Sequence, residues 1–194
     1  MIRIAFTAER FTPDHIAKIK LLLEEGGCDF MHLRYPGLSD GEIVGIVREI
    51  PLPLRRRITL HSAFDQAQEL GVGGIHLNRR SPHAPNHWEG RLSRSCHSVD
   101  EINGLDIRFD YVTLSPVFAS ISKPGYGSNE LELLHSRRLI RGDAPKVVAL
   151  GGITPGRIAT AVDCGFDGYA VLGALQWNQP IEKFKQNIRL CFNS

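Results

Sequence analysis

The sequence predicts an α/β protein, a single (β/α)8 barrel of the TIM barrel type, from two repeating patterns and the chain length. Eight short runs rich in Val, Ile, Leu and Phe recur along the chain, and each has the length of a β-strand. Segments with helical spacing separate most of them, and strands that alternate with helices pair in parallel. With 194 residues and 42% hydrophobic composition, residues 1–194 are expected to form one domain around one core.

The eight strand candidates are mostly too apolar for an antiparallel sheet that has one face in water. Strands of a parallel barrel are buried on both faces, and near-continuous apolar runs are typical of them. In chain order the runs are IRIAFT from Ile2, DFMHLR from Asp29, RITLH from Arg57, GGIHL from Gly73, RLSRSC from Arg91, FDYVTLS from Phe109, KVVALGG from Lys146 and DGYAVLG from Asp167.

The intervening helices are predicted from apolar spacing and from the residues that start and stop helices. Thr12 is the expected cap of the first helix, with Pro13 at its first position and Gly26 at its end. The same pattern predicts three further helices, which begin at Ser39, at Thr154 with Pro155, and at Ile181.

The chain is slightly shorter than the roughly 200 to 250 residues usual for this barrel. The missing length is located between Leu77 and Leu92, where Pro82, Pro85 and Gly90 interrupt any helical pattern. The fourth crossover helix is therefore expected to be reduced to a loop. An open doubly wound sheet of eight strands is the alternative fold.

The composition excludes several classes of partner. Lys plus Arg is 23 and Asp plus Glu is 21, so the net charge of +2 gives no field to attract nucleic acid or an anionic membrane. No stretch approaches the ~20 apolar residues of a membrane span. The four cysteines are far apart and lack the CxxC spacing of metal or redox sites. A cytoplasmic protein with reduced thiols is expected.

A phosphate site is predicted beyond the last two strands. In β/α barrels the loops after strands seven and eight commonly bind phosphate, and glycines there let backbone N–H groups approach the anion. The alternative is that these glycines only turn tight corners. We call this predicted site the phosphate cup, and it consists of Gly151, Gly152, Leu172 and Gly173.

Two further features suit a polyanionic ligand. Arg34 ends the second strand and can make a two-pronged contact to phosphate or carboxylate, with a surface salt bridge as the alternative. The loop after strand six carries Ser120, Ser122 and Lys123 within four positions. Two hydroxyls and an ammonium would suit a lid over the ligand, and a solvated surface loop is the other interpretation.

Histidines are the candidate proton carriers. His32, His61, His76 and His97 all fall at or near predicted strand ends, where an imidazole can move protons. For each of them, a hydrogen-bonded histidine in a packed layer is the alternative. No HxH, HExxH or clustered carboxylate spacing is present, so no metal site is predicted.

Seven motifs in this order resemble the thiamine phosphate synthase and TenI family, over nearly the whole chain from about Ile4 to Leu175. The resemblance implies a β/α barrel that is typically a homodimer. Synthases of the family join an aminopyrimidine pyrophosphate to a thiazole phosphate with the help of magnesium, and TenI-type members bind thiazole phosphate and in some cases isomerise it. The motifs are HLR, GIHL, SRSCHS, DYVTLSPVF, SKPGYG, ALGGIT and GFDGYAVLGAL.

The resemblance also implies site residues. It places the thiazole phosphate in the phosphate cup, where synthases usually have serine at the position of Gly173. The remaining substrate contacts fall on Arg34, Ser95, Ser120, Ser122 and Lys123.

The departures from the family pattern fall on the pyrophosphate half of the site. Pro36 replaces a family lysine, and His61 replaces an asparagine. Ser62 and Ser81 replace the two magnesium aspartates, and magnesium normally requires at least one carboxylate. The resemblance is therefore closer to the TenI-like branch, and magnesium is not expected.

The TenI-like interpretation needs a proton carrier from a new position. The histidine that follows strand six in tautomerising TenI proteins is Pro116 here. The resemblance then leaves His61, His97 and His32 as candidates, in that order. The expected function is binding of thiazole phosphate or thiamine phosphate, with isomerisation possible. A working synthase with an altered metal site and a non-catalytic sensor of thiamine phosphate are the alternatives.

Overall fold

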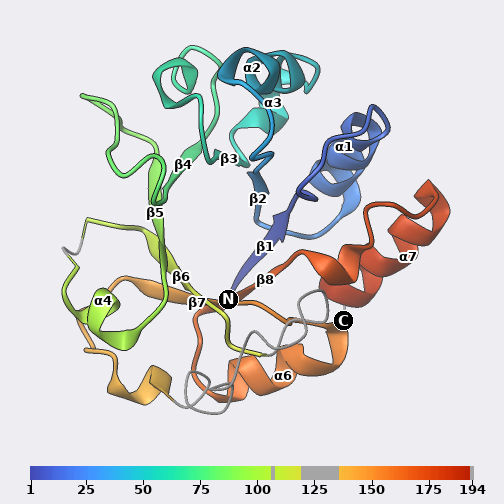
Figure 1. The fold of residues 1–194 in the computed structure, drawn as a ribbon. Coiled ribbons are helices and arrows are strands. Elements are labelled where there is room, and N and C mark those ends of the chain that lie inside the picture. Colours follow the sequence, from blue (N-terminus) through green and yellow to red (C-terminus); the bar gives the residue numbers. More distant parts are fainter. Residues whose placement is uncertain (106–107, 119–135, 193–194) are drawn as a thin grey trace.

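Eight strands form a closed parallel barrel in the computed structural model, which describes residues 1–105, 108–118 and 136–192. The strands follow one another around the ring in chain order, and pairing of the last strand with the first closes it (Figure 1). This arrangement confirms the predicted barrel and contradicts the alternative, an open doubly wound sheet. The strands are β1 (Ile2–Phe6), β2 (Phe30–Leu33), β3 (Ile58–Leu60), β4 (Gly74–Leu77), β5 (Arg91–Cys96), β6 (Tyr111–Leu114), β7 (Lys146–Leu150) and β8 (Gly168–Val171).

Helices surround the ring of strands on its outer side (Figure 1). Short 3-10 turns supplement them at η1 (Phe64–Gln66), η2 (Ser136–Leu139) and η3 (Gly173–Leu175). In the described residues the α-helices are α1 (His15–Glu25), α2 (Asp40–Arg48), α3 (Leu52–Arg55), α4 (Val99–Asn103), α6 (Pro155–Asp163) and α7 (Ile181–Phe192).

The predicted helix starts are confirmed for α2 and α6 and wrong for α1. Ser39 caps α2 in a reciprocal capping box with Glu42, and Thr154 is the N-cap of α6. In α1 the N-cap is Asp14 instead of Thr12. The Thr12 hydroxyl bonds the Asp14 carboxylate, at 2.6 Å, and the chain makes a turn before the helix begins.

Two crossover connections are short. The segment between β4 and β5 contains no helix, as its prolines and glycine predicted. The connection between β3 and β4 holds only the single turn η1, which begins after Ala63 in the left-handed conformation. Both short connections lie on one side of the barrel, because β3, β4 and β5 are neighbours in the ring.

The side chains inside the barrel form an apolar part and a polar part. Ile4, Phe6, Tyr111, Val148 and Ala170 form an apolar cluster of their own, separate from the larger core between strands and helices. Alternate residues of a strand face opposite sides, so this cluster faces inward. On β2 to β6, by contrast, most of the fully buried inward positions are polar: His32, Thr59, His76, Ser93 and Thr113.

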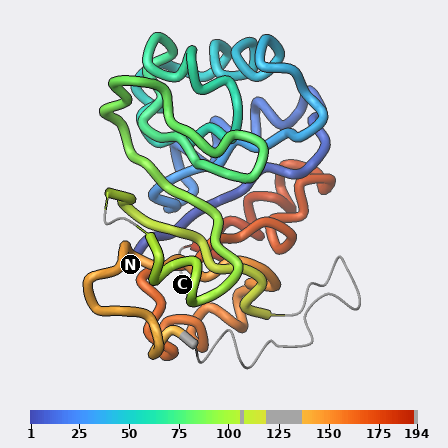
Figure 2. Tube along the Cα trace, turned by 60° about the vertical axis from the view of Figure 1, so that its left-hand side comes forward, coloured from blue at the N-terminus to red at the C-terminus, as the bar shows by residue number. Residues whose placement is uncertain are grey.

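The two ends of the described chain meet below the barrel. The Arg3 guanidinium donates to the Phe192 carbonyl, and the Tyr169 hydroxyl donates to the Cys191 carbonyl. Figure 2 shows α7 running beside the N-terminal part of the chain. The four cysteines are free thiols. Within the described residues, every helix is too short or too polar to serve as a membrane span.

Candidate functional site

The first half of the phosphate cup follows β7. Gly151 and Gly152 have φ angles of 95° and 61°, which glycine adopts without strain. A Cβ added to Gly151 would lie 2.8 Å from the Cα of Pro116. Only glycine therefore allows this close approach of two chain segments, and the sharp turn leaves the Gly152 N–H without an acceptor among the described residues.

The second half of the cup follows β8. Register pairs Leu150 with Ala170, so the carboxyl ends of β7 and β8 lie side by side. The turn η3 begins there, and its first two N–H groups, on Gly173 and Ala174, donate to no acceptor in the described part of the chain. A Cβ on Gly173 would meet no heavy atom within 4 Å. The structure thus brings together free N–H groups from two strand ends, and phosphate binding by them stays a prediction.

Arg157 is a residue of the cup that sequence reasoning missed. It lies in the first turn of α6 and donates from Nη1 to the Gly152 carbonyl, at 3.1 Å. Its guanidinium also lies 5.0 Å from the ring centre of Phe118. A cation therefore stands at the rim of the cup, where it favours an anion. Its place in the first turn after the glycine pair was the signal available in the sequence.

Arg34 lies at the mouth of the barrel, just after β2. Its backbone is held by Thr7, whose hydroxyl accepts from the Arg34 N–H and donates to the Arg34 carbonyl, both at 2.9 Å. Across the described ranges, no hydrogen bond or ion pair engages its half-buried guanidinium. The charge acts instead on His61 and His76, where it lowers the pKa. The predicted loop residues Ser120, Ser122 and Lys123 lie outside the described residues.

Three histidines from successive strands meet inside the barrel, and we call them the histidine trio: His32, His61 and His76. The ring centres are 4.4 to 5.1 Å apart. His32 Nδ1 lies 3.0 Å from His61 Nε2. One ring nitrogen from each histidine falls within 4.8 Å of the others. His32 and His76 are fully buried, and His61 retains some exposure.

The trio is neutral at physiological pH. Burial lowers the pKa of His76 to about 3, with the Arg34 charge as a smaller cause. Burial first, and the neighbouring histidines second, hold the pKa values of His32 and His61 well below the usual range. Each ring therefore keeps one proton and one lone pair, so each can donate one hydrogen bond and accept another.

A polar frame orients the trio. The Tyr111 hydroxyl lies 2.6 Å from His32 Nε2. Ser93 and Ser95 each place a hydroxyl 2.8 Å from one ring nitrogen of His76. Ser95 was predicted as a substrate contact, and its hydroxyl here contacts a histidine.

Asn78 links the ends of β3 and β4, a role that was not predicted from the sequence. Its amide donates to the carbonyls of His61, at 3.0 Å, and His76, at 3.1 Å. Its side-chain oxygen accepts from the N–H groups of Arg80 and Ser81. The amide therefore fixes the backbone of two trio members at once.

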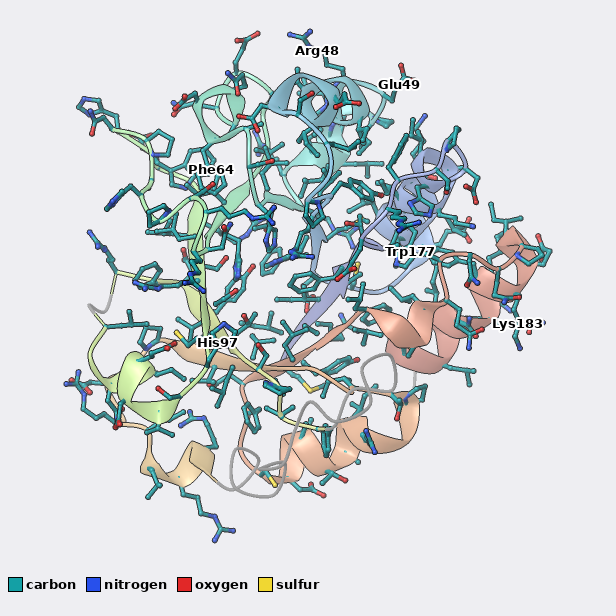
Figure 3. All side chains as sticks on the ribbon, viewed as in Figure 1. Arg48, Glu49, Phe64, His97, Trp177 and Lys183 are labelled. Carbon is teal, nitrogen blue, oxygen red and sulfur yellow. The ribbon has the colours of Figure 1, made fainter. Side chains whose placement is uncertain are left out.

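His97 stands apart from the trio. It is exposed, its Nδ1 lies 3.0 Å from the Ser115 carbonyl, and its N–H donates to the Glu101 carboxylate. Figure 3 places it after β5, with Trp177 on the other side of the barrel beside α1. Of the three histidines favoured from sequence, the structure brings His61 and His32 together. His76 joins these two histidines, because side chains alternate between the two faces of the GIHL strand and His76 therefore points into the barrel.

The two serines expected in place of magnesium ligands offer hydroxyl oxygens, and the nearby Asp40 carboxylate accepts from the Ala63 N–H. Ser81 is engaged in a turn with Asn78. Asp65 is exposed on η1. Among the described residues, the group with the spacing of a metal site is the histidine trio, which offers nitrogen instead of the oxygen ligands that magnesium prefers.

Two surface cavities, of about 510 and 840 Å³, lie at the opposite end of the barrel. One is lined by Gly73 and Arg91, and the other by Ile2 and Lys146, which begin or precede strands. Since functional groups of β/α barrels sit at the carboxyl ends of strands, neither cavity belongs to the candidate site.

Comparison with known proteins identifies a family. The family model described as thiamine monophosphate synthase matches residues 4–175. A thiamine-phosphate synthase of Methanoregula boonei is 30% identical over 84% of this chain and 80% of that protein. One of Bordetella bronchiseptica is 40% identical over 77% of this chain and 76% of that protein.

A solved structure agrees with the sequence comparisons. The crystal structure of a thiamine phosphate pyrophosphorylase from Bacteroides thetaiotaomicron superposes with a TM-score of 0.78 at 33% identity. The match covers 98% of this chain and 97% of that one. The similarity therefore extends over nearly the whole of both chains.

Proposed function

The chain belongs to the thiamine monophosphate synthase family of thiamine biosynthesis, and from this premise we propose that it binds thiazole phosphate or thiamine phosphate in the phosphate cup. The observation that carries the proposal is the pairing of two glycine turns with free N–H groups at Gly152, Gly173 and Ala174. Three N–H donors and the Arg157 guanidinium at the rim suit the oxygens of a phosphate monoester.

The proposed chemistry is acid-base isomerisation of thiazole phosphate, as in the TenI-like branch. His61 is the proposed proton carrier because it is neutral, retains some exposure at the barrel mouth and bonds His32 behind it. A proton taken by His61 can be shared with His32, whose other nitrogen meets the Tyr111 hydroxyl. This geometry favours His61, backed by His32, over His97, which is exposed and bonded elsewhere.

A working synthase is the second candidate, because the relatives at 30% and 40% identity are named as synthases. Its leaving group would be pyrophosphate, whose charge needs compensation. Arg34 is the cation available at that side, since its guanidinium has no partner in the described residues. A non-catalytic sensor of thiamine phosphate is the third candidate, and it would bind tightly without turnover.

Calorimetry with thiazole phosphate and thiamine phosphate tests the binding proposal. We expect binding to the wild-type protein, and its absence at millimolar ligand would overturn the proposal. Proton NMR of thiazole phosphate then tests isomerisation, with His61→Asn expected to lose it and His97→Asn to keep it. Release of pyrophosphate from the two precursors, abolished by EDTA, would favour the synthase, whereas binding without either reaction would favour the sensor.

The family resemblance also suggests a homodimer. We therefore propose that two copies of the chain associate in solution. Light scattering coupled to size exclusion measures the mass directly, and a particle of 21.6 kDa would contradict the dimer.

A further inference from the structure

The histidine trio has the spacing of ligands around a small metal ion. A zinc ion bonds imidazole nitrogen at about 2.0 to 2.1 Å, so two ligand nitrogens in a tetrahedral site lie about 3.3 Å apart. His32 Nδ1 and His61 Nε2 are 3.0 Å apart, and a nitrogen of His76 lies within 4.8 Å of both. One side-chain adjustment of His76 would complete three corners of a tetrahedron.

The hydrogen bonds around His76 identify its available nitrogen. The Ser93 hydroxyl lies 3.2 Å from the Ile75 carbonyl and 2.8 Å from His76 Nδ1, so when it donates to the carbonyl its oxygen accepts from His76 Nδ1–H. In that tautomer the lone pair of His76 is on Nε2, which lies 2.8 Å from the Ser95 hydroxyl. A metal ion on Nε2 displaces only this one hydroxyl, which is half-buried and can turn toward the fourth ligand.

The pair of His32 and His61 can free its lone pairs without ionising. In the metal-free protein one proton lies between His32 Nδ1 and His61 Nε2, the pair proposed above to carry a proton in isomerisation, and a metal ion would take the place of that proton and block the isomerisation. With His32 protonated on Nε2 toward Tyr111, and His61 protonated on Nδ1, both facing nitrogens become lone pairs. Metal binding therefore requires a change of tautomer and no loss of protons. The Tyr111 hydroxyl beside His32 Nε2 permits this change, because it can accept a hydrogen bond as well as donate one.

We propose that His32 Nδ1, His61 Nε2 and His76 Nε2 bind a divalent transition-metal ion of borderline softness, such as Zn²⁺. Three imidazoles without a carboxylate favour zinc, cobalt, nickel or copper over magnesium and calcium. Tyr111 and Ser93 hold the outward nitrogens of two of the rings, as is usual for histidine ligands.

The fourth position of this site is open toward an anion. Zinc with three protein ligands commonly holds water or substrate at the fourth corner. The dication and the nearby Arg34 charge repel each other, so an anionic oxygen at that corner would offset both charges. The proposed ion would therefore lie on the side of the barrel where the family resemblance places pyrophosphate and where serines replace the two magnesium aspartates.

The test is a zinc titration of the tag-free, chelator-treated protein against a competing dye. We expect one ion per chain, unaffected by excess magnesium. His61→Asn should weaken zinc binding at least a hundredfold, and the resemblance places asparagine at this position in relatives, so the fold should tolerate it. His97→Asn is the matched control, since His97 is exposed and outside the trio, and it should change affinity less than twofold.

Cobalt absorption on the wild-type protein decides the question without any variant. Cobalt in the trio should give the visible bands of a four-coordinate ion with nitrogen ligands. Substoichiometric zinc at tenfold excess, octahedral cobalt bands or equal zinc affinity of His61→Asn would each overturn the proposal. The proposal does not depend on the phosphate ligand, because zinc binding is measured without it, and Gly173→Asp should bind zinc like the wild type.

Discussion

The phosphate cup and the histidine trio lie on different arcs of one ring of strands, and they are built in different ways (Figure 1). The cup comes from two short chain segments, and its functional groups are backbone N–H groups positioned by glycines. The trio comes from β2, β3 and β4, and its functional groups are side chains fixed by a frame of hydroxyls and one amide. Glycine turns are visible in a sequence, whereas strand register is not.

This difference implies that the two regions respond to mutation separately. A backbone site is damaged by adding atoms to a glycine, and a side-chain site is damaged by removing a ligand or its support. The cup and the trio share no described hydrogen bond, so damage to one should leave the other intact. Measuring phosphate-ligand binding and zinc binding on the same variant therefore shows which of the two regions a mutation affects.

Gly173→Asp should have the largest effect on the cup. The open space around Gly173 admits the side chain, so the fold should survive, but a carboxylate would face the anion. Two unit charges 4 Å apart repel by about 4 kcal/mol near a protein surface, so we expect at least about hundredfold weaker binding of thiazole phosphate. Calorimetry measures the change.

Gly142→Asp is the matched control for this substitution. Gly142 is equally open, and it lies in the turn before β7, at the other end of that strand. It should bind the ligand like the wild type. Equal weakening in both variants would mean that the added charge acts on the whole protein and that the cup is not the binding site.

Gly151→Ala should destabilise the fold and disrupt the cup together. Gly151 has a φ of 95°, and the new Cβ would lie 2.8 Å from the Cα of Pro116. Backbone strain and overpacking each cost about 1–3 kcal/mol, so we expect a loss of about 2–4 kcal/mol in the free energy of unfolding. Urea denaturation measures it. Gly156→Ala, at an open helical position, should be neutral, and similar losses in both would contradict the steric argument.

Asn78→Ala should weaken the trio and leave the cup unchanged. It removes the donor to the His61 and His76 carbonyls, which costs about 1–2 kcal/mol of stability. Zinc affinity should fall about tenfold, as for other losses of outer-shell support. Asn103→Ala is the control, because Asn103 makes a similar pair of bonds to Leu139 and Arg141 far from the trio. An equal loss of zinc affinity in the control would show a general loss of stability.

The fold could be predicted from the sequence, and the cup could be proposed from it, because their signals are local. The pair Gly151 and Gly152 lies between an apolar strand and a helix start, so strand, turn and helix are visible in nine consecutive residues. The trio could not be predicted as a unit, because His32 is 29 residues from His61 and only register brings them to 3.0 Å. Asn78 was missed for a related reason. Its role depends on two carbonyls, which every residue has.

Gly173→Ser should change the affinity for thiazole phosphate least, and it tests the family comparison most directly. Synthases usually have serine at this position by resemblance, and a Cβ at Gly173 meets no atom within 4 Å, so the hydroxyl fits without strain. It adds one donor beside the free N–H groups of the cup. A hydrogen bond to a charged group contributes about 1.5–3 kcal/mol at best, and ordering the side chain removes part of this. We therefore expect about three- to tenfold tighter binding of thiazole phosphate by calorimetry, with no change in zinc affinity.

Gly173→Ala separates the effect of the hydroxyl from that of the added carbon, and it should bind thiazole phosphate like the wild type. If Gly173→Ala and Gly173→Ser bind equally, the hydroxyl does not reach the phosphate, and the ligand lies nearer β7 than β8.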